Sequence, residues 1–261
     1  MYGASYIYVR FGTEDHYVAA VKAAILKGNP SINIVDISHN IYPSDIGHAS
    51  YVLKNVFRDF PPNSVHLCAI DLNSREPSKL IAIKLEEHYF VGPDSGLFSL
   101  ISQQRPTAII DINSLKPIES TFEAKDILAP TASGLASGKN IHEMGPAQNE
   151  IKILYSRQLK VTKREISGNI IRVDVYGNLI TNIIKSEFDT ITRINGNQPF
   201  EVSFGREKTR KINKTYNEVE SGEFYVLFNS SGFLQIGINK GNASELLGLV
   251  LDAPVTINFE T

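Results

Sequence analysis

Two kinds of hydrophobic pattern alternate along the first half of the chain. Short apolar runs typical of buried strands are separated by longer segments in which apolar residues recur every three or four positions, as on one helix face. The strand patterns cover residues 5–11, 31–38, 64–70 and 107–112, with a hairpin over residues 79–93 that turns near Glu86 and Glu87. The helical patterns cover residues 16–30, 44–62, 94–102 and 124–138, the second with Ser44 as its N-cap. This alternation predicts an α/β fold with a largely parallel sheet covered on both faces.

The second half of the chain has a different pattern. The alternation stops near residue 146, and short strand patterns separated by turns follow in residues 168–183, 199–204, 223–239 and 253–260. A Ser-Ser-Gly sequence at residues 230–232 lies between two apolar runs and predicts a hairpin. We therefore expect an N-terminal α/β domain (residues 1–150), a linker (146–166) and a small C-terminal β-barrel domain (165–261).

Composition is that of an ordinary folded protein without a strong electrostatic bias. Of the 261 residues, 42% are hydrophobic and 21% charged, and the formal net charge is −2. The absence of a basic tract argues against nucleic acid as a partner. No apolar run approaches the ~20 residues that span a bilayer, and no signal sequence is recognisable, so we expect neither membrane insertion nor secretion. Cys68, the only cysteine, lies in an apolar run, and we interpret it as a core residue of a cytoplasmic protein.

Acidic residues follow three of the predicted strands. Asp36, Asp71 and Asp94 lie at or near strand ends, where ligands collect in parallel sheets. Each alone is more often a helix cap, a turn former or a solvated carboxylate than a catalyst, but their recurrence at one edge makes that edge a candidate site. We predict no metal, because no metal-like spacing relates His16, His48, His66 and His88.

One segment of the second half combines strand-forming residues with polar side chains. In residues 171–183 (IRVDVYGNLITNI), Asp174, Tyr176 and Asn178 occupy alternate positions, beside Gly177. Alternate positions of an extended strand face the same side, so we expect a carboxylate, an aromatic ring and an amide to point together. The competing interpretation is a turn in which Asp174 is satisfied locally and Tyr176 belongs to the core.

Six stretches of the chain carry a resemblance when they are taken together and in order. They are residues 11–25, 35–46, 89–101, 122–138, 173–183 and 227–248. The chain resembles the S-adenosyl-L-methionine (SAM) hydroxide adenosyltransferases, a superfamily that also contains fluorinating and chlorinating enzymes. The resemblance implies an α/β domain followed by a β-barrel domain, and a homotrimer with SAM sites between the N-terminal domain of one subunit and the C-terminal domain of its neighbour. SAM is implied as a substrate, and no cofactor is implied.

The reaction that the resemblance implies is attack of water or hydroxide on the ribose C5′ of SAM, with release of methionine and formation of adenosine. The sulfonium becomes neutral as it departs and needs no acid, so the protein has to hold the nucleophile in line, remove its water shell and position the sugar. We expect no covalent intermediate. Halogenation is disfavoured because Asp71 matches the hydrolytic branch.

The resemblance also implies roles for individual residues. Asp71 matches the acidic member of an Asp–Arg–His set that positions water. Asp174 and Asn178 match residues at the methionine end of SAM, with Tyr176 packed nearby. The remaining substrate-binding candidates are Tyr216, Asn229 and Ser230, which match adenine contacts, together with Phe122 and Arg10.

Three positions depart from the family pattern. Arg10 replaces the Asp that binds both ribose hydroxyls, and an arginine cannot accept those hydrogen bonds. Ser78 and Glu123 stand where the Arg and His of the water-positioning set are expected. Arg75 from a rearranged loop, or Glu123 as a base, would compensate. Arg10 itself faces either an anionic ligand group or a nearby aspartate.

Three hypotheses follow. The first is an adenosine-forming SAM hydrolase with a rearranged catalytic set. The second is a non-catalytic protein with a degenerate site that binds SAM, adenosine or another nucleoside. The third is hydrolysis or binding of a different, more anionic nucleoside, with Arg10 as the specificity residue.

Overall fold

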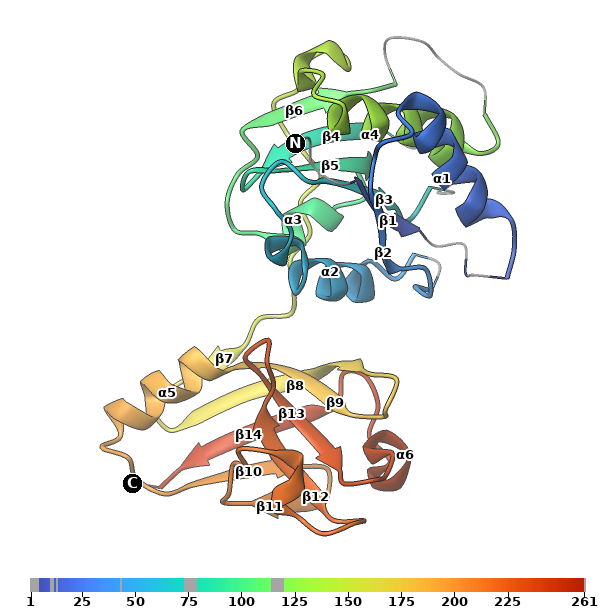
Figure 1. Ribbon diagram of the computed structural model, residues 1–261. Coiled ribbons are helices and arrows are strands. Elements are labelled where there is room, and N and C mark those ends of the chain that lie inside the picture. The colour runs from blue at the N-terminus through green and yellow to red at the C-terminus, as the bar shows by residue number, and fades with distance from the viewer. Residues whose placement is uncertain are drawn as a thin grey trace. The chain divides into compact units, whose positions relative to one another are not determined.

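The computed structural model describes residues 12, 14–42, 44–72, 79–113 and 120–260, and the backbone of residues 5–9. It divides into two compact units, Met1–Ser156 and Arg157–Thr261 (Figure 1). The finer expectation of a linker over residues 146–166 stays a prediction.

A mixed sheet forms the centre of the first unit, with the strand order β2-β1-β3-β5-β4-β6. Its strands are β1 (Ser5–Val9), β2 (Ile34–Ser38), β3 (Val65–Ala69), β4 (Leu80–Leu85), β5 (His88–Pro93) and β6 (Ala108–Asp111). β1 pairs in parallel with β2 and β3, and β3 pairs in parallel with β5. β4 is antiparallel to both of its neighbours, β5 and β6. The predicted α/β class is confirmed in coarse form, but the sheet is mixed, because the β4–β5 hairpin places an antiparallel strand inside it.

The hairpin turns where the sequence predicts it. Glu86 and Glu87 both have left-handed backbones, with φ of 49° and 63°. Two consecutive left-handed residues match the right-handed twist of the flanking strands, which is why a two-residue connection is sufficient. The guanidinium of Arg58 donates two hydrogen bonds, of 2.7 and 2.6 Å, to the Glu86 carboxylate and fixes the turn.

Helices cover both faces of this sheet. The helices of the first unit are α1 (Tyr17–Gly28), α2 (Ile46–Lys54), α3 (Leu97–Ile101) and α4 (Ala129–Ala136), with 3-10 turns η1 (Phe57–Asp59) and η3 (Ile141–Glu143) and a π-helical turn η2 (Ala124–Leu128). Every residue of β3 is buried, and alternate residues serve different cores. Leu67 packs in the cluster that includes residues of α1 and α4, whereas Cys68 packs in the cluster that includes residues of α2 and α3.

The start of α2 differs from the prediction by one residue. Its N-cap is Asp45, whose side chain accepts a 2.9 Å hydrogen bond from the backbone N–H of His48. Ser44 instead has a left-handed backbone with φ of 58°. Ser and Asp are both good caps, so the local pattern alone did not separate the two positions.

The second unit is a curved antiparallel sheet, with the order β11-β10-β14-β8-β9-β13-β12 and β7 beside β8 (Figure 1). Its elements are β7 (Lys160–Val161), β8 (Glu165–Val173), β9 (Leu179–Ile184), α5 (Lys185–Ile194), β10 (Phe200–Phe204), β11 (Glu207–Thr209), η4 (Tyr216–Glu218), β12 (Phe224–Phe228), β13 (Phe233–Ile238), α6 (Ala243–Leu247) and β14 (Pro254–Phe259). β8 pairs with β14 through its first half and with β9 through its second. One strand thereby joins both parts of the sheet, which gives the barrel-like form that the sequence predicts in outline.

The core of the second unit lies inside this curved sheet. Along β8, Ile166 and Ile170 are buried while the intervening Ser167 and Asn169 are partly exposed, which is the period-two pattern of a strand with one covered face. Most of the buried apolar side chains form one cluster, to which α5 contributes Phe188 and Ile191.

Candidate functional site

A turn between β8 and β9 carries Asp174, Tyr176 and Asn178. β8 ends at Val173 and β9 begins at Leu179, so the three residues are not part of one extended strand. The side chain of Asp174 folds over the turn: Oδ1 accepts 2.9 Å hydrogen bonds from the backbone N–H groups of Tyr176 and Asn178. The strand alternation expected for these residues is therefore wrong, although the three side chains line the same pocket. A turn of this kind forms because a short acidic side chain can satisfy the amides that follow it.

The turn has to contain glycine at position 177. Gly177 has φ of 78°, and a Cβ there would lie 1.9 Å from Oδ1 of Asn242. The backbone carbonyl of Gly177 accepts a 3.0 Å hydrogen bond from the backbone N–H of Ser244, in α6. Asn242 in turn caps α6 by accepting from the N–H of Glu245. The turn is thus docked against the start of α6.

Of the two interpretations of this segment, the structure combines parts of both. Asp174 is satisfied within the turn, and Asn178 adds a 2.9 Å hydrogen bond from its Nδ2 to Asp174 Oδ2. Tyr176 is not a core residue, because 76% of it is exposed. The same turn nevertheless lines a pocket, so local satisfaction of Asp174 does not remove it from a site.

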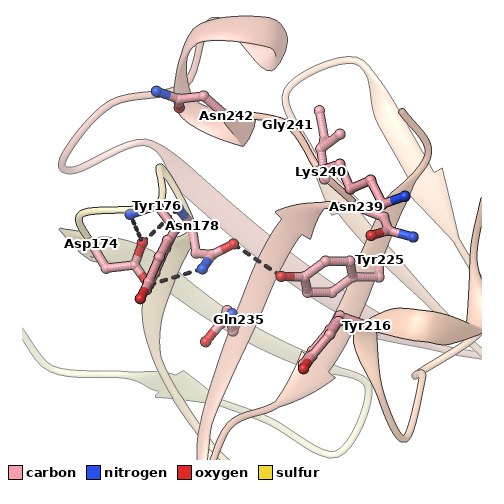
Figure 2. A pocket seen from close by; sticks show the side chains of 11 residues that line it. Asp174, Tyr176, Asn178, Tyr216, Tyr225, Gln235, Asn239, Lys240, Gly241 and Asn242 are labelled. Carbon is pink, nitrogen blue, oxygen red and sulfur yellow. Dashed lines mark hydrogen bonds between the residues drawn. The ribbon is translucent and has the colours of Figure 1, made fainter. Parts of the chain in front are cut away.

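An open pocket of about 820 Å³ lies beside this turn. Figure 2 shows the turn on one side and the rings of Tyr216 and Tyr225 on the other, with Gln235 between them. The ring centroids of Tyr216 and Tyr225 are 6.4 Å apart. The lining residues are Asp174, Tyr176, Asn178, Tyr216, Tyr225, Gln235, Ile238, Asn239, Lys240, Gly241 and Asn242. Volume and lining match a small-molecule site with a few polar groups.

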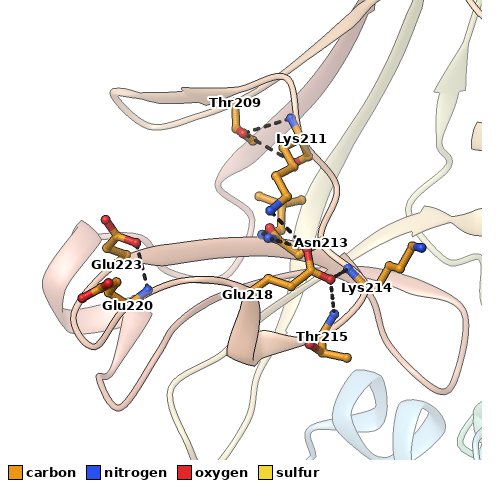
Figure 3. A network of polar contacts seen from close by, with 9 residues as sticks. Thr209, Lys211, Asn213, Lys214, Thr215, Glu218, Glu220 and Glu223 are labelled. Carbon is orange, nitrogen blue, oxygen red and sulfur yellow. Dashed lines mark hydrogen bonds and ion pairs between the residues drawn. The ribbon is translucent and has the colours of Figure 1, made fainter.

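A polar network around Glu218, shown in Figure 3, borders the turn that carries the pocket residue Tyr216. Glu218 and Thr215 form a reciprocal capping box around the short η4 turn that contains Tyr216. Oε1 of Glu218 also accepts a 2.9 Å hydrogen bond from the N–H of Lys214, and the Lys211 ammonium lies 3.1 Å from Oε2. These contacts, with the Lys214 amide the largest, keep the pKa of Glu218 below its usual value.

Asn229 and Ser230 do not line this pocket. They lie in the β12–β13 hairpin, where Oδ1 of Asn229 accepts hydrogen bonds from the N–H groups of Ser231 (3.0 Å) and Phe233 (3.1 Å). Ser230 is exposed. Asn229 reaches the pocket only through its Nδ2, which lies 3.4 Å from Oε1 of Gln235. Their predicted contact with adenine stays a prediction.

The candidate residues of the first unit lie at loop and helix ends. Asp71 follows β3 with φ of 66°, and its Oδ1 accepts a 2.9 Å hydrogen bond from Oγ of Ser44, itself left-handed. Glu123 directly precedes the π-helical turn η2, and partial burial raises its pKa. Phe122 packs edge-on against Tyr17, with ring centroids 5.4 Å apart. Arg10, Ser78 and Arg75 lie outside the described residues.

Metal ligands, a reactive cysteine and membrane-spanning helices were also sought among the described residues. No group of three or more His, Cys, Asp or Glu side chains there is arranged to hold a metal ion. Cys68 is fully buried, and burial raises the pKa of its thiol, as expected for a core cysteine. No helix among the described residues has the length and apolar character needed to cross a bilayer.

Several pocket residues were not predicted from the sequence. Tyr225 and Gln235 lie in apolar strand patterns, and Asn239, Lys240 and Asn242 follow the second of these strands. Gln235 carried a usable signal, because it is a polar residue inside the otherwise apolar run FLQIGI. Tyr225 carried none, since tyrosine is common in strands.

The fold and the pocket together describe an α/β unit followed by a barrel-like β unit that carries a ligand-sized cavity. The chain belongs to the SAM hydroxide adenosyltransferase family. The model of the family's N-terminal domain matches residues 8–145, and the model of its C-terminal domain matches residues 168–256. This confirms the family resemblance seen in the sequence.

Individual relatives agree over nearly the full length. The chain is 35% identical to the (R)-S-adenosyl-L-methionine hydrolase of Methanocaldococcus jannaschii, covering 92% of this chain and 89% of that one. It is 29% identical to the enzyme of the same name from Thermus thermophilus, covering 95% and 96%. The crystal structure of an uncharacterized conserved protein from Thermotoga maritima matches with a TM-score of 0.85 at 31% identity, covering 97% and 99%. The relatives with assigned names act on SAM as a substrate, and those names include no cofactor.

Proposed function

We propose that the protein hydrolyses SAM to adenosine and L-methionine, by attack of water or hydroxide on the ribose C5′. The observation that carries the proposal is the pocket on the second unit, which places the Asp174 carboxylate opposite tyrosine rings within about 820 Å³. A carboxylate suits the cationic methionine end of SAM, and aromatic rings suit a flat adenine. Membership of the family and the names of the hydrolases that it resembles support the same reaction.

The first unit supplies the proposed water-positioning carboxylate, Asp71. Asp71 and Ser44 both have positive φ, a conformation that costs free energy for residues other than glycine. Their hydrogen bond of 2.9 Å joins the loop after β2 to the end of β3 and orients the Asp71 carboxylate. Because the sulfonium leaves as a neutral group, an oriented and partly desolvated water is the main requirement. Glu123, with its raised pKa, is the proposed base where the family has a histidine.

A homotrimer with shared sites is part of the proposal. Large apolar side chains are exposed around the pocket: Val175 is 88% exposed, Tyr176 76% and Tyr216 58%. A monomer gains nothing from leaving such side chains in water next to an open cavity, whereas an N-terminal domain of a neighbouring subunit would cover them. A cytoplasmic location stays a prediction from the single buried cysteine.

A second candidate function is binding of SAM or adenosine without turnover. It is favoured by Arg10, Ser78 and Glu123, which replace the ribose-binding Asp and two members of the water-positioning set. The pocket of the second unit does not discriminate between the two functions, because binding requires it in both.

One experiment separates the two candidates. Purified protein is incubated with SAM, adenosine is followed by chromatography, and SAM binding is measured by calorimetry. Hydrolysis predicts adenosine formation that Asp71→Ala abolishes and that Asp59→Ala, at an exposed position of η1, leaves unchanged. SAM binding without adenosine formation would support the second candidate, and absence of both binding and product would overturn both.

A further inference from the structure

Five side chains of the second unit follow one another along the pocket, and hydrogen bonds join them at three of their four contacts. Asn229 Nδ2 lies 3.4 Å from Gln235 Oε1, and the Gln235 side chain acts on the Tyr225 phenol as a hydrogen-bond donor that opposes the rise of its pKa. The Tyr225 hydroxyl donates to Asn178 Oδ1 at 3.0 Å, and Asn178 Nδ2 donates to Asp174 Oδ2 at 2.9 Å. Four of the five line the pocket, and Figure 2 shows the last two bonds.

Which group donates and which accepts in each of these hydrogen bonds follows from the carboxylate of Asp174 at the end of the series. An ionised carboxylate only accepts hydrogen bonds, so the Asn178 side chain has to present its nitrogen to Asp174 and its oxygen to Tyr225. Tyr225 must then donate its proton to Asn178, which leaves the phenol oxygen to accept from the Gln235 nitrogen. The Gln235 oxygen is left to accept from Asn229. One charge therefore orients two amides and one hydroxyl.

Packing prevents these side chains from taking another arrangement. Tyr225 lies directly opposite Gly237 in the β12–β13 pairing. A Cβ at Gly237 would lie 2.2 Å from the Tyr225 hydroxyl and 2.5 Å from Asn178 Oδ1, so these two groups meet in the space that the missing side chain leaves. Tyr225 is only 6% exposed, and its burial raises the pKa of the phenol. The hydroxyl thus remains a proton donor toward Asn178.

We propose that Tyr225 and Gln235 are positioning residues that hold Asn178 and Asp174 in one orientation, so that the pocket presents a fixed anion to a cationic group of its ligand. This inference rests on the proposed function and adds to it. It assigns the discrimination between positively charged and neutral nucleosides to the hydrogen-bonded side chains from Asn229 to Asp174. Neither residue has to touch the reacting atoms. Their role is to keep the carboxylate of Asp174 oriented, since hydrogen bonds to a charged group are stronger than those between neutral groups.

The first test compares three ligands that differ in positive charge. SAM has an ammonium and a sulfonium, S-adenosyl-L-homocysteine has only the ammonium, and adenosine has neither. Binding is measured calorimetrically in an Asp71→Ala background, which removes turnover under the proposed function. Tyr225→Phe is expected to raise Kd for SAM about tenfold and to leave Kd for adenosine within about twofold. S-adenosyl-L-homocysteine identifies which cationic group is recognised. If it is the ammonium, Tyr225→Phe should raise Kd for this compound as much as for SAM. If it is the sulfonium, Tyr225→Phe should change its Kd as little as that of adenosine.

The second test reverses the direction of the hydrogen bonds between Gln235, Tyr225 and Asn178. Gln235→Glu is nearly isosteric but replaces a donor to the Tyr225 hydroxyl by an acceptor, so the hydroxyl proton is drawn away from Asn178. We expect Gln235→Glu to weaken SAM binding more than Gln235→Leu, although it changes the shape less. Tyr155→Phe, at a position that is 85% exposed in the first unit, is the control and should change neither ligand's Kd. Equal losses for SAM and adenosine in Tyr225→Phe, or no loss for either, would overturn the proposal.

A third measurement does not depend on any ligand. In urea unfolding, the destabilisation caused by Tyr225→Phe should nearly vanish in an Asn178→Ala background, because the bond that it removes is already absent. If the destabilisations caused by Tyr225→Phe and Asn178→Ala were additive, the proposed hydrogen bonding between these two side chains would be wrong. If the wild-type protein binds none of the three ligands, the proposed function and the assigned ligand class both fail, while coupled unfolding effects would still establish this hydrogen bonding as structural.

Discussion

The two units of the protein bury polar side chains in different ways. In the second unit, Asp174, Asn178 and Tyr225 are hydrogen-bonded in sequence beside an open pocket. In the first unit, His66 and His88 face each other at 3.3 Å, between β3 and β5, within a group of phenylalanine rings. Burial, together with the smaller effect of the neighbouring His88, lowers the pKa of His66 to about 3.

The difference shows that a buried polar group is not by itself a functional site. The histidine pair is closed to solvent and is stable only in the neutral state, so it contributes to the core and limits its stability in acid. The hydrogen-bonded side chains at Asp174 are open to the pocket on one side, and they contain a carboxylate that accepts three hydrogen bonds from Tyr176 and Asn178.

The largest effect is expected from Gly237→Ala. A methyl group there would lie within 2.2 Å of the Tyr225 hydroxyl, and overpacking of this kind costs about 3 kcal/mol. The substitution should also abolish SAM binding. Gly47→Ala is the matched control in the first unit: the nearest atom to its new methyl is 3.6 Å away, and alanine in helix α2 should stabilise by about 0.5–1 kcal/mol. Urea unfolding and calorimetry measure both, and an unchanged Gly237→Ala variant would contradict the packing.

Acid should act on the first unit more than on the second. All six histidines lie within residues 1–156. Because the folded-state pKa of His66 is below its ordinary value of 6.5, the unfolded chain binds more protons between about pH 6.5 and 3, and stability falls as the pH is lowered through this range. His66 alone should account for about 2 kcal/mol between pH 7 and 5.

This pH dependence is measured as the free energy of unfolding in urea at pH 7 and pH 5. In His66→Leu the difference between the two values should shrink, whereas His142→Gln, at an exposed position, should behave like the wild type. An equal difference in all three proteins would show that the histidine pair is not responsible.

A smaller effect separates Asn229 from its neighbour Ser230. Asn229→Ala removes the acceptor for two backbone amides of the hairpin and should destabilise by about 1 kcal/mol. Ser230→Ala removes no hydrogen bond of the hairpin and should change stability by less than about 0.5 kcal/mol. If Ser230 contacts adenine, as the family resemblance implies, its replacement should weaken adenosine binding without changing the unfolding midpoint. No change in either quantity would count against that contact.

The smallest effect is expected at Glu218, which acts on the pocket through Tyr216. Glu218→Ala removes the capping box and should weaken adenosine binding about two- to threefold, because Tyr216 is held less firmly. Glu218→Gln keeps an acceptor for the backbone amides and should retain most of the affinity. In a Tyr216→Ala background Glu218→Ala should have no further effect, and a persisting loss would assign Glu218 a role of its own.

Much of the fold could be predicted because local patterns decide it. The alternation of strands and helices, the hairpin at Glu86 and Glu87 and the barrel-like second unit all follow from hydrophobic period and turn residues. The mixed character of the first sheet could not be predicted in the same way, since the hairpin could in principle join the sheet by either strand. The structure places β5, the second strand of the hairpin, beside β3.

The site was predictable in its residues but not in its construction. The residue patterns were sufficient to predict the family, the two halves of the chain and four candidate residues, Asp174, Tyr176, Asn178 and Tyr216. The folded protein was needed to show that the first three lie in a turn, and that Asn178 contacts Tyr225, 47 residues later in the chain. The reason is physical: that contact depends on the pairing of β13 with β9 and β12, which is fixed by burial of their apolar faces over the whole strand. A local pattern predicts that a strand forms, whereas the side chains it meets across the sheet are set by the packing of distant segments.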